Sequence, residues 1–367
     1  METQFNIKIE DISIKSPIAA ACMAGISDGG YIEKISEYIG IGILGGYAID
    51  DDTIKAARIM SNEGRNEFLP RNLIEYIKVQ KAIVELAGVV PAINIRASEA
   101  ISLANLVENL GKNLIYEIDA HCRQKPMIDA KSGEYLLLHP EVLISFVQTL
   151  KIAGVVVSVK IRAGVAENDP ELIRLLWKAG ADIIHVDLMD NGFPYLKKIR
   201  DVSPVFIIAN NGITTYAKAK DMFSHGADMI SLARNANKNT LSELDKSIRQ
   251  NTKEHGWYNA PKQLCRGGDI RSLAFCCMPV KPCPLLPTLE KLKISPQEFV
   301  NMKMEAVAGT PLEQGSSTCF GSLAYCCKDS TPCMFRDAAL NQAGIKKTNY
   351  MELKRELSRK LMKKIFT

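Results

Sequence analysis

The stretch Asn113-Leu-Ile-Tyr-Glu-Ile-Asp-Ala-His121 is a mainly apolar run that leads directly into a polar loop presenting Cys122. A short apolar run that ends in such a loop predicts a buried strand of a parallel sheet. Further runs of this kind recur along the first 240 residues, with helical segments between them. This alternation of strand and helix is the pattern that buries both faces of a parallel sheet. The eight runs are Ser16–Cys22, Ile39–Tyr47, Val89–Ala97, Asn113–His121, Val155–Gly164, Ala181–Met189, Pro204–Gly212 and Ala227–Arg234.

Eight strand–helix repeats within about 220 residues predict a closed (β/α)8 TIM barrel. A doubly wound open sheet is the alternative, because the number of strands does not prove closure. The intervening segments carry helix-start signals. Pro140 can begin one helix, and Asp169-Pro170-Glu171 predicts an N-cap followed by proline at the first helical position.

The composition is that of an ordinary globular protein. The 367 residues are 47% hydrophobic and 24% charged, and no apolar run approaches the length of a membrane span. The N-terminal residues lack a basic segment followed by an apolar core, so we expect a cytoplasmic protein that does not contact a membrane. The net charge of +5 is too small to indicate a polyanionic partner by itself.

Polar residues gather where the predicted strands end. In a barrel of this type the active site lies at the C-terminal ends of the strands. Six of the eight strand ends carry a basic, amide or thiol group directly after the apolar run. One such residue is commonly a solvated strand end, but convergence on one rim predicts a shared binding site. The polar residues are Asn94, Arg96, Asp119, His121, Cys122, Lys160, Arg162, His185, Asp187, Asn210, Asn211, Arg234 and Asn235.

The last two strand ends indicate a phosphate. Asn211-Gly212 opens a turn ahead of a predicted helix, and Ala233-Arg234 opens another loop, so free backbone N–H groups from both could hold a phosphate. Barrels commonly bind phosphate after strands seven and eight. Lys160 and His185 would then lie along a flavin ring, where the positive charge of the lysine favours the anionic reduced form.

Each of these candidate residues also has an ordinary structural interpretation. Lys160 can be a surface charge at a strand end, and His185 can be a hydrogen-bonded imidazole of the core. Cys122 can be a small buried hydrophobic residue.

Taken together, these residues resemble the tRNA-dihydrouridine synthase family of FMN-binding barrels from about Ser16 to Asn237. Ala21–Asp28 is similar to the opening motif of the family, Val159–Gly164 to the strand that carries the flavin lysine, and Asn211–Ile213 to a phosphate segment. Cys122 falls at the position of the catalytic cysteine. The FMN-binding residues that the resemblance implies are Met23, Ala24, Gly25, Asn94, Lys160, His185, Asn211, Gly212, Ala233 and Arg234.

The chemistry that the resemblance implies is hydride transfer between FMN and one carbon of an activated C=C bond. The Cys122 thiol would give a proton to the other carbon, as a general acid. Uridine in tRNA is the substrate that the family name implies. The partners to be expected are therefore tRNA or another RNA, together with a redox partner protein.

The chain also departs from the family pattern. Cys22 stands where a proline is usual, Asp119 replaces an asparagine, Asn94 replaces a glutamine, and Val186-Asp187 replaces glycine-arginine. Asp119 and Asp187 are expected to add negative charge where an RNA substrate would bind. The flavin is therefore better supported than the tRNA uridine.

Cysteines are concentrated near the C-terminal end. Ten are present, and eight of them fall between Cys265 and Cys333. The segment Ser272–Cys283 recurs as Ser322–Cys333, and each copy has one earlier cysteine. Four thiolates are the number that holds one iron–sulfur cluster or one zinc ion. Adjacent cysteines favour two 4Fe–4S clusters, with zinc and disulfides as alternatives. The predicted ligands are Cys265, Cys276, Cys277, Cys283, Cys319, Cys326, Cys327 and Cys333.

Helix signals lie between and after the two cysteine groups. Ser295-Pro-Gln-Glu298 is a capping box that predicts a helix to about Val307, and Thr310-Pro-Leu-Glu313 repeats the pattern. Residues 346–367 contain eight basic and two acidic residues with leucines at helical spacing. They predict an amphipathic helix with one buried face and either a solvated or an RNA-contacting basic face.

The cysteine pattern resembles the methanogenesis marker protein 9 domain over about residues 262–340. We therefore predict a barrel over 1–255, a small, mostly helical metal-binding domain over 256–340, and a basic C-terminal helix over 341–367. Iron–sulfur clusters would relay electrons to or from the flavin. The alternatives are a metal-binding interaction protein that keeps the barrel as scaffold, and an assembly or maturation factor for a methanogenesis enzyme.

Overall fold

The computed structural model describes residues 5, 7–200, 202–203, 205–255, 286–314, 323–325 and 334–366. The eight cysteines of the C-terminal repeat lie outside these residues, and so does the metal site predicted for them. Within the described ranges, no helix is both long and apolar enough to cross a bilayer.

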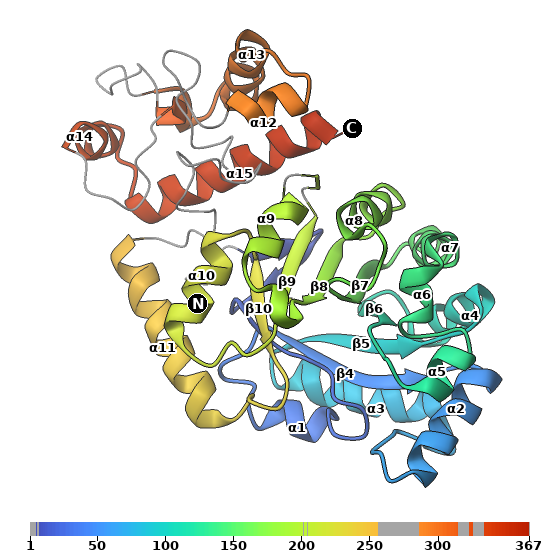
Figure 1. The fold of residues 1–367 in the computed structure, drawn as a ribbon. Helices are drawn as coiled ribbons and strands as arrows, with labels where there is room; N and C mark the ends of the chain where they lie inside the picture. Colours follow the sequence, from blue (N-terminus) through green and yellow to red (C-terminus); the bar gives the residue numbers. More distant parts are fainter. Residues whose placement is uncertain are drawn as a thin grey trace.

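A closed parallel barrel forms the larger part of the chain (Figure 1). Closure is shown by the last strand, which pairs with the first through Ile230 and Ile18, so the open-sheet alternative is wrong. Seven of the eight strands lie within the predicted apolar runs, and the strand Ile41–Ala48 extends one residue beyond its run. In barrel order, the strands are β10 (Met229–Leu232), β3 (Ile18–Ala20), β4 (Ile41–Ala48), β5 (Val90–Arg96), β6 (Ile115–Ala120), β7 (Val156–Arg162), β8 (Ile183–Asp187) and β9 (Phe206–Asn210).

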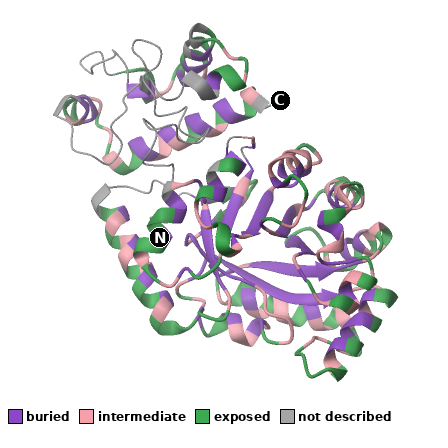
Figure 2. Ribbon diagram, viewed as in Figure 1, coloured by how far each residue is buried: buried purple, intermediate pink, exposed green. Residues whose placement is uncertain are grey.

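Helices surround the barrel and bury its strands, as Figure 2 shows. Pro140 begins α7, as predicted. The cap of α8 lies one residue earlier than predicted, because Asn168 accepts the hydrogen bond from the Glu171 N–H. The helices are α1 (Gly29–Glu33), α2 (Asp51–Asn62), α3 (Leu73–Leu86), α4 (Ala100–Leu110), α5 (Lys125–Asp129), α6 (Tyr135–Leu138), α7 (Pro140–Ile152), α8 (Asp169–Lys178), η1 (Met189–Asn191), α9 (Pro194–Arg200), α10 (Tyr216–Ser224) and α11 (Lys238–His255).

A short hairpin that the sequence analysis did not predict precedes the barrel. It consists of β1 (Ile7–Ile9) and β2 (Ile12–Ile14), paired antiparallel. Its isoleucines belong to the barrel core. The hairpin turn at Glu10 and Asp11 lines a groove with Val155 and Val156, where β7 begins, so the hairpin lies at the N-terminal end of the barrel.

The described part of the C-terminal region is helical and has its own apolar core. The capping box of α13 is confirmed, with Ser295 and Glu298 exchanging hydrogen bonds. The second capping box is wrong: Thr310 makes no side-chain cap, its hydroxyl donates to the Val307 carbonyl, and only a 3-10 turn follows. The elements are α12 (Leu286–Lys291), α13 (Pro296–Val307), η4 (Pro311–Glu313), η5 (Leu323–Tyr325), α14 (Met334–Gln342) and α15 (Lys347–Phe366).

Helix α15 joins this C-terminal unit to the barrel. Its buried face, which includes Tyr350, Leu357 and Leu361, packs in the same core as α12 and α13, so the tail is not a separate unit. On its other side, Arg359 shares a groove of about 470 Å³ with Phe206, where β9 begins. The C-terminal unit therefore meets the barrel at its N-terminal end, opposite the rim where the predicted site residues lie (Figure 1).

Candidate functional site

A chain of hydrogen bonds crosses the interior of the barrel, with Glu117 at its centre. Glu117 on β6 accepts from the Asn94 amide at 2.9 Å through Oε1 and from the Ser158 hydroxyl at 3.1 Å through Oε2. The same Oε2 lies 2.8 Å from His185 Nδ1, and His185 Nε2 lies 2.8 Å from the Ser231 hydroxyl. Asn210 of β9 donates to the Ser231 hydroxyl. Six consecutive strands of the closed barrel, β5 to β10, thus contribute to one buried network.

Glu117 is the anionic centre of this network. Burial alone would raise its pKa, but His185, Lys160 and Asn94 together hold the pKa of the carboxyl below its ordinary value. Sequence reasoning missed Glu117 as a site residue. A charged residue between the apolar residues Ile115 and Ile118 of a buried strand was the available signal.

His185 lies where the flavin histidine was predicted, yet the chain itself occupies both of its ring nitrogens. The side chain is fully buried between Glu117 and Ser231. The Asn210 amide donates to the Ser231 oxygen, which leaves the Ser231 hydroxyl free to donate to Nε2. This geometry matches the alternative interpretation, a hydrogen-bonded core imidazole, and the predicted contact with a flavin stays a prediction.

Lys160 lies near the C-terminal end of β7. The residue is 6% exposed, and within the described part of the chain it forms no hydrogen bond or ion pair. Burial alone would lower its pKa, but Cys22, Glu117 and Asp119 raise it above its ordinary value. Nearby on β5, the buried amide oxygen of Asn94 also has no hydrogen-bond partner among the described residues. A charged donor and a neutral acceptor are thus available to a ligand.

The two predicted phosphate loops leave backbone N–H groups unused. Within the described part of the chain, the N–H groups of Gly212, Ile213, Arg234 and Asn235 make no backbone hydrogen bond. Gly212 has a φ of +62°, a conformation that glycine adopts without strain. Two neighbouring loops with free N–H groups fit a phosphate monoester, because such groups form anion-binding concavities.

The Met23-Ala24-Gly25 segment is half-buried beside the same rim. Gly25 has a packing role there: with a φ of +69°, a Cβ atom would stand 2.6 Å from the Asn66 backbone. The preceding Cys22 is a neutral thiol at neutral pH, because burial raises its pKa to about 12 against the opposing charge of Lys160.

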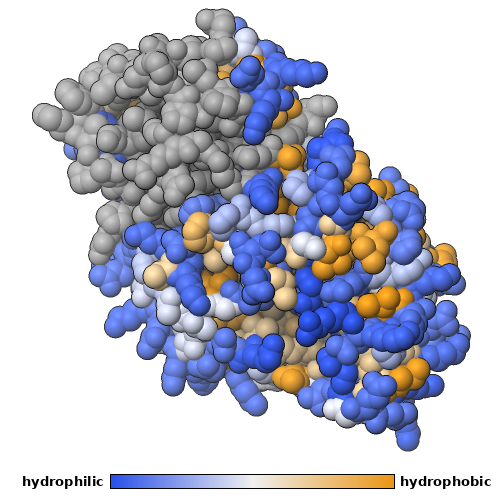
Figure 3. All heavy atoms as spheres, viewed as in Figure 1, coloured by the Kyte–Doolittle hydropathy of each residue, from blue (hydrophilic) through white to orange (hydrophobic). Residues whose placement is uncertain are grey.

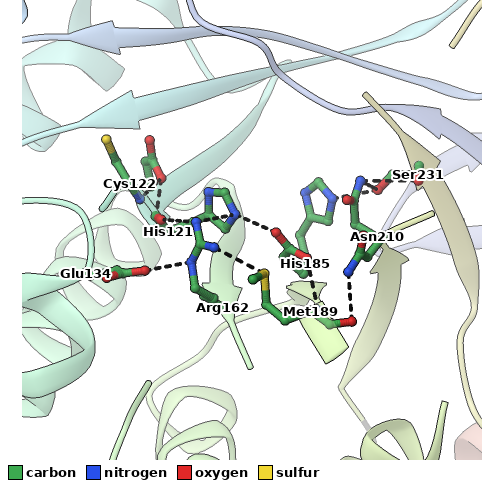
Figure 4. A network of polar contacts seen from close by, with 11 residues as sticks. His121, Cys122, Glu134, Arg162, His185, Met189, Asn210 and Ser231 are labelled. Carbon is green, nitrogen blue, oxygen red and sulfur yellow. Dashed lines mark hydrogen bonds and ion pairs between the residues drawn. The ribbon is translucent and has the colours of Figure 1, made fainter. Parts of the chain in front are cut away.

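Cys122 lies in the loop after β6, with its backbone firmly held. Its N–H donates to Asp119 at 3.2 Å, and its carbonyl accepts from the Glu134 N–H at 2.9 Å. The thiol packs with Met60 of α2 and Met127 of α5. In Figure 4 the sulfur points away from the side chains of Arg162 and His185. Burial raises the thiol pKa, so the group is protonated at neutral pH.

The two acidic departures from the family pattern are both paired. Asp119 is buried and accepts from Arg96 Nε at 3.0 Å, while Asp187 lies 2.8 Å from His121 Nε2. Arg162 contacts the His121 carbonyl at 3.2 Å on the same rim. The Asp119 carboxylate is buried and paired with Arg96, so it does not present its charge at the surface. The expectation that Asp187 adds negative charge where an RNA would bind stays a prediction.

Comparison with known proteins shows which family part of this sequence resembles. Residues 92–266 match the sequence model of the family described as dihydrouridine synthase (Dus). The chain carries a dihydrouridine synthase domain. A protein of Rickettsia conorii named as a probable tRNA-dihydrouridine synthase is 26% identical over 243 residues, which are 63% of this chain and 69% of that protein. The domain makes the chain a flavin-dependent oxidoreductase.

Two further matches are an archaeal relative and a solved structure with a similar fold. An uncharacterized protein of Methanocaldococcus jannaschii is 49% identical over 108 residues, 29% of this chain and 70% of that protein, so the chain belongs to the same family as this archaeal protein. The crystal structure of DHODH from Eimeria tenella in complex with ferulenol superposes with a TM-score of 0.50 at 13% identity, covering 71% of this chain and 88% of that one. The second match supports the barrel fold alone.

The dihydrouridine synthase domain brings most of the predicted residues together at one end of the barrel. Lys160, Asn94 and the two phosphate loops lie at the C-terminal ends of their strands. Figure 3 shows this part of the molecule as mainly hydrophilic, with more apolar side chains in a hollow over the barrel. Among the described residues, no three His, Cys, Asp or Glu side chains are arranged to hold a metal ion.

Proposed function

We propose that this chain uses FMN to reduce an activated C=C bond, with uridine in tRNA as the first substrate to test and Cys122 as the proton donor. The observation that carries the proposal is the Lys160 ammonium group, which is buried and charged but has no hydrogen-bond or ion-pair partner in the described chain. A buried charge without a partner is costly unless a ligand supplies one.

The residues at the rim fit the parts of FMN. The unused N–H groups of Gly212, Ile213 and Arg234 would hold the phosphate, Lys160 would donate to an electron-rich edge of the ring, and Asn94 would accept from a ring N–H. Bound FMN supplies the hydride in this chemistry. Glu117 acts indirectly, because its hydrogen bond fixes the Asn94 amide with the oxygen unpaired.

Cys122 would supply the proton. Its thiol is protonated at neutral pH, as an acid must be before it donates. In this structure the sulfur packs against Met60 and Met127, so the thiol has to turn out of that apolar contact to reach a substrate. Transfer of hydride and proton adds H⁻ and H⁺ across the C=C bond and leaves the cysteine as a thiolate that is reprotonated from solvent.

For the C-terminal region, we propose that the eight cysteines bind two metal centres, 4Fe–4S clusters or zinc. Two ammonium groups support an anionic centre nearby. Lys303 and Lys354 are fully buried, and both donate to the Ala324 carbonyl at 3.3 and 2.8 Å. Cys326 and Cys327 follow Ala324 closely in the sequence. Buried positive charge offsets the negative charge of four metal-bound thiolates.

The position of the C-terminal unit bears on electron relay. Its described helices meet the barrel at the end opposite Lys160, through Arg359 of α15. This favours a second candidate function for the described helices of the unit, an interaction module that receives a redox partner protein or another macromolecule. Electron relay to the flavin stays a prediction.

Anaerobic purification tests both proposals. We expect an absorption spectrum with flavin bands, one FMN per chain by extraction, and iron or zinc in stoichiometric amounts. Absence of flavin from protein purified with excess FMN would contradict the enzyme proposal. For the substrate, dihydrouridine in tRNA from a deletion strain is compared with that of its parent, and unchanged levels at every position would exclude tRNA uridine.

Replacing Lys160 with methionine is expected to weaken FMN binding at least tenfold, because a hydrogen bond from a charged group contributes about 1.5–3 kcal/mol. The free protein should keep its stability, since the variant removes a buried charge that lacks a partner. FMN dissociation constants from flavin fluorescence quenching provide the measurement. Lys151→Met is the control, because Lys151 pairs with Asp182 at the far end of the barrel. Equal affinity in Lys160→Met and the parent would contradict the assignment.

A further inference from the structure

A buried charged pair fixes the loop that presents Cys122. Arg96 on β5 donates from Nε to Asp119 Oδ2 at 3.0 Å and from Nη1 to Glu67 at 2.7 Å. The other oxygen of Asp119 accepts from the N–H groups of His121 at 3.0 Å and Cys122 at 3.2 Å. Arg96 is 6% and Asp119 is 4% exposed. Asp119 thus uses one oxygen for the loop and the other for the guanidinium group.

We propose that Arg96 and Asp119 act as a positioning pair for the Cys122 thiol: Asp119 orders the loop backbone, while Arg96 holds Asp119 in place and sets the charge beside the sulfur. This proposal rests on the proposed role of Cys122 as proton donor and goes beyond it by assigning two residues. It also accounts for aspartate at position 119. A neutral side-chain oxygen can accept the same two loop N–H groups, but a buried carboxylate requires a cation, and Arg96 provides it.

The charges around the thiol act in opposite directions. Burial raises the Cys122 pKa most, Arg96 lowers it, and Asp119 and Glu67 raise it, while the Gln124 N–H lowers it. The helices packed against the thiol, α2 and α5, contribute the apolar residues Ala56, Met60 and Met127 to its surroundings. On the adjoining loops, Glu134 is paired with Arg162. Arg96 and Asp119 therefore shift the pKa of the Cys122 thiol in opposite directions.

Alkylation of Cys122 measures this directly in the full-length protein. Iodoacetamide labelling rates are followed from about pH 7 to 11, with the Cys122 peptide quantified by mass spectrometry, because only the thiolate reacts. We expect Arg96→Gln to move the midpoint upward by about one pH unit and Asp119→Asn to move it downward by a similar amount. At a fixed pH below the midpoint, these shifts correspond to about a tenfold slower and a tenfold faster reaction.

The double variant Arg96→Gln/Asp119→Asn keeps two polar side chains and removes both charges, so its midpoint should return close to that of the parent. It also carries the test if a single variant does not fold, since neither member of the Arg96–Asp119 pair is then left charged without the other; Glu67 keeps its carboxyl without Arg96 in this variant, as it does in Arg96→Gln. Glu67→Gln should move the midpoint downward. Turnover with FMN bound should fall in Arg96→Gln without a change in the FMN dissociation constant.

Asp182→Asn is the matched control. Asp182 also accepts a backbone hydrogen bond, from Val157 at 2.8 Å, and pairs with Lys151, but it does so at the opposite end of the barrel. It should leave the labelling profile of Cys122 unchanged. Shifts in the same direction in both single variants, or a double variant that does not return toward the parent, would overturn the proposal. Labelling requires neither flavin nor substrate, so a failure of the proposed enzyme function would be seen separately.

Discussion

Replacing Cys122 with alanine is expected to lower the turnover number for C=C reduction by about 10²–10⁴-fold, the usual contribution of a positioned general acid. FMN should remain bound with parental affinity, because the Cys122 sulfur contacts Met60 and Met127 rather than Lys160 or the phosphate loops. The measurement is anaerobic single turnover, in which substrate is mixed with prereduced enzyme and the return of oxidized flavin absorbance is followed. This experiment isolates the chemical step from the electron donor.

The pH dependence of this step has a defined sign. Because burial places the Cys122 pKa above its ordinary value of 9.0, the thiol stays protonated through the neutral range. The single-turnover rate should therefore be flat near pH 7 and should fall as the pH rises through the thiol pKa, where the acid is lost. The alanine variant should lack this fall.

Met127→Leu is the control for packing. It keeps an apolar side chain of similar volume in the cluster that surrounds the thiol, and such exchanges are usually well tolerated. Near-parental turnover in this variant, together with the large loss in Cys122→Ala, would separate proton donation from loop packing. Full activity in Cys122→Ala would refute the role of the cysteine as acid.

The strands of the barrel could be predicted because each is a short apolar run with a turn at both ends. Seven of the eight predicted runs are longer at both ends than the strand they contain, and β4 extends one residue past its run, to Ala48. Cap positions were less certain, since Asn168 and Asp169 are both good capping residues and only the backbone geometry selects the first. The β1–β2 hairpin was missed although isoleucines alternate along it, because two strands of three residues give little periodicity.

The candidate site was predictable in outline and not in its pairings. The fold places the strand ends on one rim, so the common position of Asn94, Lys160 and the phosphate loops followed from strand assignment alone. The hydrogen-bond partners of Arg96 and His185 could not be predicted from the strand assignment. Arg96 meets Asp119, 23 residues away, and His185 meets Glu117, 68 residues away. Those pairings depend on the register of neighbouring strands and on the side to which each side chain points.

Replacing Glu117 with alanine is expected to destabilise the barrel by about 3–5 kcal/mol, the cost of removing one partner of a buried charged network. The substitution leaves the side chains of Asn94, Ser158 and His185 buried without their shared acceptor. Glu117→Gln keeps the shape and one acceptor oxygen, so a smaller loss of about 1–2 kcal/mol is expected. Equilibrium urea unfolding at pH 7, followed by far-ultraviolet circular dichroism, gives the free energies.

The pH dependence of unfolding distinguishes lost charge from lost packing. The pKa of Glu117 in the folded protein lies below its ordinary value of 4.5. Its ionised form therefore stabilises the fold above that ordinary value, and this contribution disappears as the pH falls through the folded-state pKa. The difference in unfolding free energy between the parent and Glu117→Gln should consequently shrink between pH 5 and the folded-state value. A difference that stays constant over this range would mean that the carboxylate charge does not hold the network together. The charge of Lys160 would then depend on Asp119 and Asp187 instead.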